Sequence, residues 1–437
     1  MLRMLRGRAK AQTGSSHHSS PAPAPAPKTP LDDEDLLQEI LLRLPPKPSS
    51  LSLPRASLVC RGWRSILSDP EFLERFRKNH HTPPLLGFFA GHVHATPVFT
   101  PILDSPDRIP ASRFPVPQSH SRNDEWRFMG CRHGLAVLLE VSRREAVVWH
   151  PLTGQRRHVS FPPGMHTDDW NRWHAAVQCA DAADGHVHGD CFSNPFKLVL
   201  ILVAQRVRAF ACLYESASGV WGDIASTATR DTICYTEPSV LIGNEFCWLL
   251  GKGDILAFDI QRQSLGVIEK PDMRRYYSSV RLFRTEDNGP GLACLSKLTI
   301  LLWARKSNYD GVVGWEMLQK TIKLKGLFPR KMPSYDKLVY LSGYDEDTNA
   351  IVLTTETGNF TLQLDSAQIR HIIKRDYICD NTFYPYTNFY TAGNTQLSYP
   401  AIHKLLVEEA YTPGSRIEFP AITGQKKIAK LYFIFDI

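Results

Sequence analysis

The sequence lacks the short motifs that mark common catalytic and cofactor-binding sites. It contains no GxSxG, HExxH, P-loop or GxGxxG pattern, which removes the usual local signs of a serine hydrolase, a zinc protease or a nucleotide-binding site. Cysteine and histidine are both present, but no spacing places a base beside a thiol, so no nucleophile is predicted. We therefore expect a non-catalytic protein that needs no cofactor.

Long apolar runs and paired cysteines are also missing. The longest strongly apolar stretch, residues 198–204, is far shorter than the ~20 residues of a membrane-spanning helix, so we expect a soluble protein. The nine cysteines are odd in number, scattered and free of any CxxC pair. This usage argues against a disulfide framework and favours a reducing compartment, either the cytosol or the nucleus.

Basic charge is scarce outside the amino-terminal segment. Five of the positive charges in the formal net charge of +7 precede the first acid, Asp32, which leaves +2 for residues 31–437. Nucleic-acid binding is not expected, because no cluster of Lys and Arg with aromatics stands out. Residues 1–30, with an alternating proline tract at 21–27, are predicted to form a disordered arm. The same Arg- and Ser-rich composition also resembles an organelle transit peptide.

What the sequence does contain, in residues 31–79, is a run of short amphipathic helices. Asp32 or Asp33 is a candidate N-cap of the first, whose apolar face ends at the two prolines 45–46. The same spacing predicts a second helix over 56–67 and a short third one over 72–76. A segment of this size cannot bury all of its large apolar side chains, so we expect part of this surface to bind a partner.

This segment resembles the F-box, and more narrowly that of the plant F-box proteins in which a β-rich substrate-binding region follows. The likeness rests on residues 36–37 (LL), 39–41 (EIL), 43–46 (RLPP), 55–60 (RASLVC), 63–64 (WR) and 68–72 (SDPEF). It implies docking onto a Skp-type adaptor, and through it onto the cullin and RING subunits of an SCF-type ubiquitin ligase. The adaptor-binding residues that it implies are Leu36, Leu37, Ile40, Leu41, Leu44, Pro45, Pro46, Val59, Cys60 and Trp63.

From about residue 85 onward the pattern changes to short apolar runs separated by Gly, Pro, Asn and Asp, which predicts an all-β domain. The candidate strands are 85–90, 135–141, 146–150, 197–203, 209–215, 246–250, 255–260, 292–295, 299–304, 350–355 and 359–364. An apolar strand that runs into a polar turn recurs at 146–155, 211–221, 255–265 and 359–369, and a further unit fits near 301–315. At ~40–50 residues per blade, residues 85–394 are predicted to form a β-propeller of about six blades.

The same region also resembles the plant F-box-associated domain in its sequence motifs. Segments that carry this likeness include GCRHGLAVLL (130–139), VVWHPLTGQRR (147–157) and YPYTNFYTAG (384–393). Residues 395–437 match nothing recognisable and are predicted to be a C-terminal extension. The expected architecture is thus a small all-α F-box module followed by a large all-β propeller domain.

Substrate contact is expected in loops at one face of the propeller, because connecting loops vary freely on a fixed scaffold. Four loops mix aromatic and charged residues, and their candidate contact residues are Trp126, Trp170, Trp173, Tyr309 and Trp315. The group closest to a metal site is His186, His188, Asp190 and Cys191. It lacks a second, separated ligand pair, so it is interpreted as a polar loop and no metal is predicted.

The main hypothesis from sequence is a non-enzymatic substrate receptor, with an adaptor at the helices and an unknown target protein at the β domain. One alternative is an F-box scaffold that binds the adaptor without supporting degradation. Another is a propeller-based hydrolase, which paired carboxylates in a central channel would favour. Neither a nucleic acid nor a membrane is expected as a partner.

Overall fold

The computed structural model describes most of the chain between residues 33 and 391. The described residues are 33–46, 53–57, 59–91, 97–102, 109–117, 126–166, 172–181, 186–204, 207–234, 237–272, 277, 279–307, 310–328, 339–374 and 382–391. The chain divides into two compact units, residues 1–41 and 42–437. The predicted arm (1–30) and C-terminal extension (395–437) lie outside the described residues. No described helix is long and apolar enough to cross a membrane.

Four helices occupy the amino-terminal segment: α1 (Glu34–Leu42), α2 (Leu53–Ala56), α3 (Arg61–Ser68) and α4 (Pro70–His80). Asp33 caps α1, since its Oδ1 accepts the backbone N–H groups of residues 35 and 36, at 3.1 Å each. Asp69 caps α4 in the same way, by accepting the N–H of Phe72 at 2.9 Å. The α-helical module predicted from sequence is therefore confirmed.

The prediction of a single helix over 56–67 is wrong, because the structure has two helices there, and α2 ends at Ala56 before α3 begins at Arg61. Cys60 is extended, with φ −160° and ψ 172°, and its Sγ accepts the N–H of Trp63 at 3.5 Å. Cys60 therefore acts as an N-cap where the apolar spacing had placed it inside a helix. The spacing still identifies the buried side chains of α3, which are Trp63, Ile66 and Leu67.

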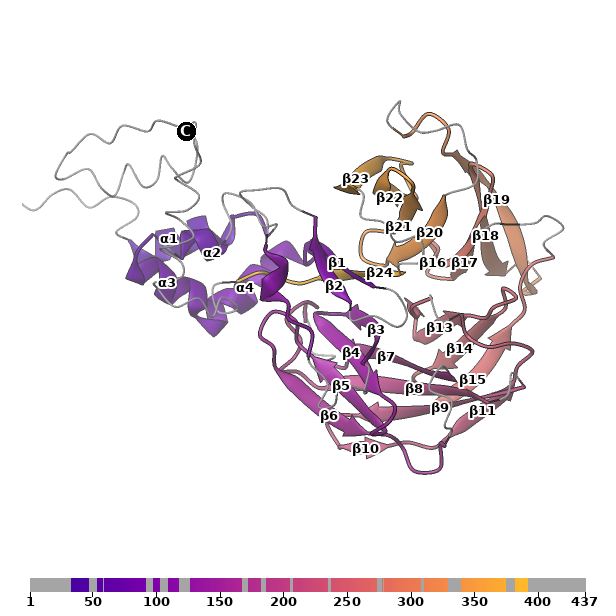
Figure 1. Cartoon of the computed structure of the whole chain (residues 1–437). Coiled ribbons are helices and arrows are strands. Elements are labelled where there is room, and N and C mark those ends of the chain that lie inside the picture. Colours follow the sequence, from indigo (N-terminus) through magenta and orange to yellow (C-terminus); the bar gives the residue numbers. More distant parts are fainter. Residues whose placement is uncertain are drawn as a thin grey trace, which may run out of the picture. The chain divides into compact units, whose positions relative to one another are not determined.

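Six antiparallel sheets follow one another around a ring in chain order (Figure 1). We call them blades 1–6. Blade 1 is β3 (Arg127–Arg132), β4 (Leu135–Glu140), β5 (Glu145–Trp149) and β6 (Arg156–Ser160); blade 2 is β7 (Trp173–Cys179), β8 (Phe196–Ala204), β9 (Arg208–Glu215), β10 (Val220–Trp221) and β11 (Ala225–Ala228); blade 3 is β12 (Val240–Ile242), β13 (Glu245–Leu249), β14 (Ile255–Asp259) and β15 (Ser264–Ile268).

The ring continues through two further four-stranded sheets and closes with a sheet of three described strands. Blade 4 is β16 (Ser279–Arg284), β17 (Pro290–Ser296), β18 (Thr299–Ser307) and β19 (Val313–Lys323); blade 5 is β20 (Tyr340–Asp345), β21 (Ala350–Thr355), β22 (Gly358–Gln363) and β23 (Ile369–Lys374); blade 6 is β24 (Thr382–Thr387), β1 (Leu85–Gly91) and β2 (Val98–Pro101), with the 3-10 helix η2 (Ala111–Arg113) beside β2. First strands of neighbouring blades contact one another at the inner wall of the ring, in the pairs β3–β7, β12–β16, β16–β20, β20–β24 and β24–β3. The predicted β-propeller of about six blades is confirmed.

Blade 6 closes the ring by joining the two ends of the propeller sequence. β24 pairs antiparallel with β1, from Thr382 opposite Gly91 to Thr387 opposite Leu85. Phe89 of β1 is fully buried and lies next to five other aromatic rings, those of Phe99, Phe114, Phe128, Trp149 and Tyr386, with centroids 5.1–6.3 Å away. These rings come from blade 6 and blade 1, so closure is stabilised by apolar packing as well as by the backbone ladder.

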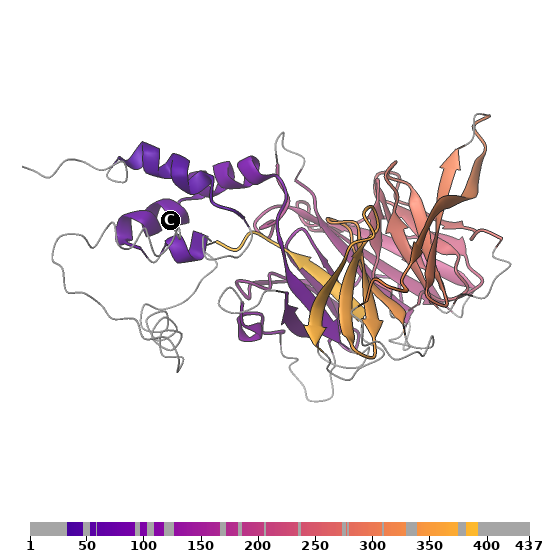
Figure 2. The same cartoon turned by 90° about the horizontal axis from the view of Figure 1, so that it is seen from above.

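The internal repeat found in the sequence corresponds to one strand position in the blades. Its four copies fall on β5, β9, β14 and β22, which are the third strands of blades 1, 2, 3 and 5, and the unit suspected near 301–315 contains β18 of blade 4. One hairpin departs from the common pattern. β18 and β19 extend beyond the neighbouring sheets (Figure 2).

Candidate functional site

The helical module presents part of the predicted adaptor-binding set at the surface and buries the rest. Leu36 is 45% exposed, Cys60 is exposed, and Ile40, Pro45, Pro46 and Val59 are half-buried. The remaining four side chains are buried: Leu37, Leu41, Leu44 and Trp63. The first group is therefore accessible to a partner, whereas the side chains of the second group are not.

Within the unit 42–437, α4 is attached to the propeller by a charged and an aromatic contact. Arg77 Nη2 lies 3.3 Å from Asp190 Oδ2, and the other carboxylate oxygen of Asp190 lies 3.0 Å from His150 Nε2. The Phe76 ring packs edge-on against Phe389 at 6.2 Å. Both carboxylate oxygens of Asp190 are occupied by these contacts. Asp190 therefore has a structural role and is not a candidate metal ligand, although the sequence had grouped it with His186, His188 and Cys191.

The structure buries two of the five tryptophan and tyrosine residues predicted to contact a substrate. Trp126 is 8% exposed and packs in the core between blades 6 and 1, and Trp173 is fully buried in the core between blades 1 and 2. Neither ring can offer a contact surface in this fold, because the core covers it. Trp170 and Tyr309 lie outside the described residues. Trp315 is half-buried, and its Nε1 donates to the carbonyl of Glu269 at 2.7 Å.

Trp315 lies in an exposed apolar patch that we call the hairpin patch, formed by Val312, Val313, Trp315 and Met317. The valines are 64% and 51% exposed and Met317 is 50% exposed. The patch sits on the β18–β19 hairpin that extends past the other sheets (Figure 2). Among the described residues, this hairpin is where a predicted substrate-contact residue coincides with accessible apolar surface.

The centre of the ring contains a small polar cavity of about 50 Å³. Arg132, from β3, lines it and pairs with Glu346, with Nε to Oε2 at 2.9 Å and a second bond from Nη2 to Oε1. The same guanidinium donates to the carbonyls of Val177 (3.3 Å) and Ser239 (3.1 Å). One side chain thus connects blade 1 to blade 2, to the segment before blade 3, and to the end of the first strand of blade 5.

Other arginines on the inner strands make similar links between blades. Arg281, in blade 4, pairs with the buried Glu237 and donates to the carbonyl of Leu341 in blade 5. Arg127 donates to the carbonyl of Trp173 at 3.1 Å, which joins blades 1 and 2. These guanidinium groups satisfy backbone carbonyls at the ring centre and hold the inner strands together.

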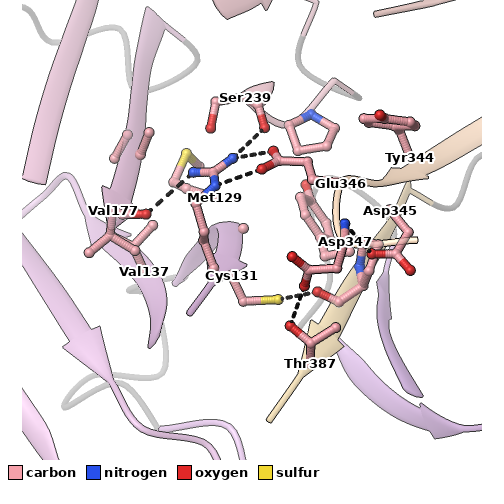
Figure 3. Close-up of a pocket in the computed structure, with 17 residues that line it drawn as sticks. Met129, Cys131, Val137, Val177, Ser239, Tyr344, Asp345, Glu346, Asp347 and Thr387 are labelled. Atoms are coloured by element: carbon pink, nitrogen blue, oxygen red, sulfur yellow. Dashed lines mark hydrogen bonds and ion pairs between the residues drawn. The ribbon is translucent and has the colours of Figure 1, made fainter. Parts of the chain in front are cut away.

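Three consecutive carboxyl groups, Asp345, Glu346 and Asp347, line the cavity (Figure 3). Burial and the neighbouring Asp347 raise the pKa of Asp345 to about 7. Asp345 accepts bonds from Thr348 Oγ1 and from the N–H of residue 347, while Asp347 accepts the Thr387 hydroxyl at 2.7 Å. Glu346 accepts the Leu241 N–H at 3.1 Å in addition to Arg132. All three groups are therefore engaged in structural contacts.

The carboxyl groups at the ring centre are not arranged as the free acid and base that the hydrolase alternative requires. Glu346 pairs with Arg132, Asp345 accepts bonds from Thr348 and from the N–H of residue 347, and Asp347 accepts the Thr387 hydroxyl. The geometry consequently favours a structural role for the ring centre and a binding role for the outer surfaces.

Comparison with known proteins agrees with the two-part architecture. A family model described as F-box domain matches residues 33–75, and one described as F-box protein AT5G49610-like, beta-propeller matches residues 127–387. The putative F-box/kelch-repeat protein At1g15680 of Arabidopsis thaliana is 24% identical over 404 residues, which cover 82% of this chain and 91% of that protein.

Two solved structures show a distant likeness to the chain. A structural genomics protein of unknown function from Bacteroides thetaiotaomicron is 11% identical, with a TM-score of 0.34, and the match covers 66% of this chain and 65% of that one. The β-propeller domain of Cps50 (Swd1) from Myceliophteria thermophila is 10% identical, with a TM-score of 0.31, covering 60% and 89%.

Proposed function

Since the chain belongs to the family of F-box proteins with an AT5G49610-like β-propeller, we propose that it is a substrate-recognition subunit of an SCF-type ubiquitin ligase. In this role α1–α4 bind a Skp-type adaptor, and the propeller binds a target protein. The observation that carries the proposal is one chain in which an F-box precedes a closed six-bladed ring. The proposal also places the protein in the cytosol or the nucleus.

The proposed role in ubiquitin transfer is geometric and not catalytic. A receptor raises the effective concentration of a substrate lysine near the conjugating enzyme, so it needs a rigid body with two separate binding surfaces. The engaged carboxyl groups at the ring centre support this assignment. The hairpin patch supports a protein target, because exposed apolar groups beside an aromatic side chain are typical of protein interfaces.

Adaptor binding is tested by replacing Leu36 with aspartate in the full-length chain. We expect at least a ~30-fold loss of affinity for a Skp-type adaptor, because a charge replaces an exposed leucine at a desolvated contact. Leu36 is preferable to the buried Leu41 and Trp63, whose replacement would disturb the module itself. The measurement is calorimetric or surface-based titration with purified adaptor.

The matched control for this experiment is Val220→Asp, which places the same charge on an exposed apolar residue of β10 (61% exposed, against 45% for Leu36). This variant is expected to bind the adaptor like the wild type. Unchanged adaptor affinity of a folded Leu36→Asp protein, measured beside this control, would remove Leu36 from the proposed contact. Failure of the wild-type protein to bind any Skp-type adaptor would remove the ligase role itself.

Substrate capture is tested by proximity labelling in cells with the wild type, Leu36→Asp and the double variant Val313→Asp/Met317→Asp. Targets should be labelled by the first two proteins and should accumulate when Leu36→Asp replaces the wild type or when the proteasome is inhibited. The hairpin variant should lose the same partners, since two charges disrupt the apolar patch. Partners that depend on the hairpin but never change in abundance would instead indicate a non-degradative scaffold.

A further inference from the structure

Blade 2 contains a cluster of two thiols and two imidazoles, which we call the Cys2His2 cluster: Cys179, His186, His188 and Cys191. Cys179 is the last residue of β7, and the other three residues lie in the segment that leads to β8. One potential ligand atom from each side chain lies within 4.8 Å of all the others. Both thiols are buried and both imidazoles are half-buried.

The distances within the cluster fit a tetrahedral metal ion. Ligand bonds of ~2.3 Å to sulfur and ~2.0–2.1 Å to nitrogen place tetrahedral sulfur and nitrogen ligands about 3.5 Å apart. His186 Nε2 lies 3.4 Å from Cys179 Sγ and 3.5 Å from Cys191 Sγ, and His188 Nδ1 lies 3.9 Å from Cys191 Sγ. Small movements of the side chains would therefore bring all four atoms to bonding distance of one ion.

The residues around the cluster orient its ligand atoms. Asp181 Oδ2 lies 3.3 Å from Nδ1 of His186, and Asn194 Nδ2 donates to the same carboxylate oxygen at 2.5 Å. This contact directs Nε2 of His186 toward the sulfurs, in the carboxylate–histidine arrangement that commonly supports bound zinc. The ring of His133 stacks on His188, with centroids 3.7 Å apart and planes within 2°, and thereby fixes the second imidazole.

Backbone N–H groups are directed at both sulfurs. The N–H of Asp181 donates to Cys179 Sγ at 3.4 Å, and the N–H of Gly189 donates to Cys191 Sγ at 3.3 Å. Hydrogen bonds to a thiol sulfur favour its deprotonated form, which is the form that binds metals.

The segment that carries three of the four ligands is held in place from outside the cluster. Gly189 has φ +155°, and a Cβ there would lie 2.7 Å from the ring of Phe389. A Cβ on Gly134 would lie 2.0 Å from the carbonyl oxygen of Gly189, so the two backbones are in close contact. Asp190, between the ligands, is bound by Arg77 and His150. The ligand positions are thus largely fixed by the fold.

We propose that Cys179, His186, His188 and Cys191 bind one structural zinc ion, which joins the end of β7 to the segment before β8. Two thiolates and two imidazoles are a donor set that zinc prefers, and a site with four protein ligands leaves no open position for catalysis. Because the four ligands come together only in the folded chain, binding of the ion stabilises the folded propeller. The proposal does not rest on the receptor role, because its evidence comes from blade 2 and not from the hairpin patch.

The proposal is tested by the metal content of the full-length protein, purified under reducing conditions and equilibrated with zinc. We expect about one tightly bound zinc per chain by elemental analysis, and a cobalt-substituted protein with the intense absorption of a tetrahedral thiolate–imidazole site. Chelator treatment should lower Tm. A chain that holds less than about a tenth of an equivalent of zinc, and gives no such cobalt spectrum, would overturn the proposal.

Variants assign the ion to the four residues. Cys191→Ser and His188→Gln are expected to weaken zinc binding at least tenfold and to make Tm insensitive to chelator. The matched controls are Cys212→Ser, which removes a thiol from β9 in the same blade, and His158→Gln, which removes an imidazole from β6; both should retain the metal. If Cys191→Ser does not fold, the assignment is tested by the cobalt spectrum of His188→Gln, which should lose the absorption of the wild-type site. Zinc content equal to wild type in either ligand variant, or a Cys179–Cys191 disulfide in the reduced preparation, would contradict the assignment.

Discussion

Replacing Arg132 with methionine is expected to reduce the free energy of unfolding of the propeller by about 3–5 kcal/mol, measured by urea denaturation. The side chains of Arg132 and Glu346 are only 9% and 18% exposed, so the variant leaves the Glu346 carboxylate buried without its guanidinium partner. It also removes the hydrogen bonds to the carbonyls of Val177 and Ser239. An unpaired buried charge costs more than the salt bridge itself contributes, which is why the expected effect is large.

Two further variants separate this effect from a general loss of arginine. Arg262→Met removes an ion pair with Asp259 on the surface of blade 3, where Arg262 is 84% exposed, and should change stability by no more than about 0.5 kcal/mol. The double variant Arg132→Met/Glu346→Gln no longer carries the buried charge and should recover at least half of the single-variant loss. A loss for Arg132→Met as small as that for Arg262→Met would contradict a structural role of the ring-centre network.

The Asp345→Asn variant is expected to remove a pH dependence of stability worth about 2–3 kcal/mol between pH 5 and pH 8. The pKa of Asp345 is raised to about 7 in the folded protein, against ~3.9 for an unfolded aspartate. The folded state therefore binds more protons than the unfolded state between these values, and stability falls as the pH rises through this window. Above pH 7 the Asp345 carboxylate is ionised at the ring centre, beside Asp347 and Glu346, and there it destabilises the folded state most.

The comparison to measure is the difference between wild type and Asp345→Asn in urea unfolding at pH 5 and at pH 8. The lost hydrogen bonds of the carboxylate produce an offset that is the same at both pH values, so only the change in the difference reports the ionisation. Glu269→Gln, which neutralises an exposed carboxyl group of the same propeller, should leave the pH profile unchanged. A constant difference between Asp345→Asn and wild type would show that Asp345 ionises normally.

The candidate strands predicted from sequence are the middle strands of the blades, and the inner and outer strands were missed for a physical reason. Strands such as β4 and β8 are buried on both faces and therefore read as continuous apolar runs. Outer strands such as β6 are mostly exposed and carry polar residues. Inner strands contain the arginines and acids of the ring centre, and bulges near Gly130 in β3 and Gly343 in β20 interrupt their alternation.

The candidate sites were predicted from sequence only where local spacing determines them. The F-box pattern identified the helices, but a spacing that fits one helix could not reveal the N-cap role of Cys60. Trp126 and Trp173 were predicted to be surface residues because charged residues are their neighbours in sequence. The structure places Trp126, directly before β3, and Trp173, the first residue of β7, in the core. The sequence also missed Cys179, whose pairing with the later ligands depends on the path of the chain after β7. The spacing Cys-x6-His-x-His-x2-Cys was the only local sequence pattern that indicated Cys179 as a fourth ligand.

The pairing of β1 with β24 also has a consequence during protein synthesis. About 290 residues separate Gly91 from Thr382, so at ~5–20 residues per second the ribosome needs roughly 15–60 s to supply the partner of β1. During that interval Leu86, Phe88 and Phe89, which are fully buried in the finished ring, have no strand to cover them on one side. We therefore expect chaperones to bind the nascent chain of this protein. A stalled ribosome would leave β1 unpaired and prone to aggregation.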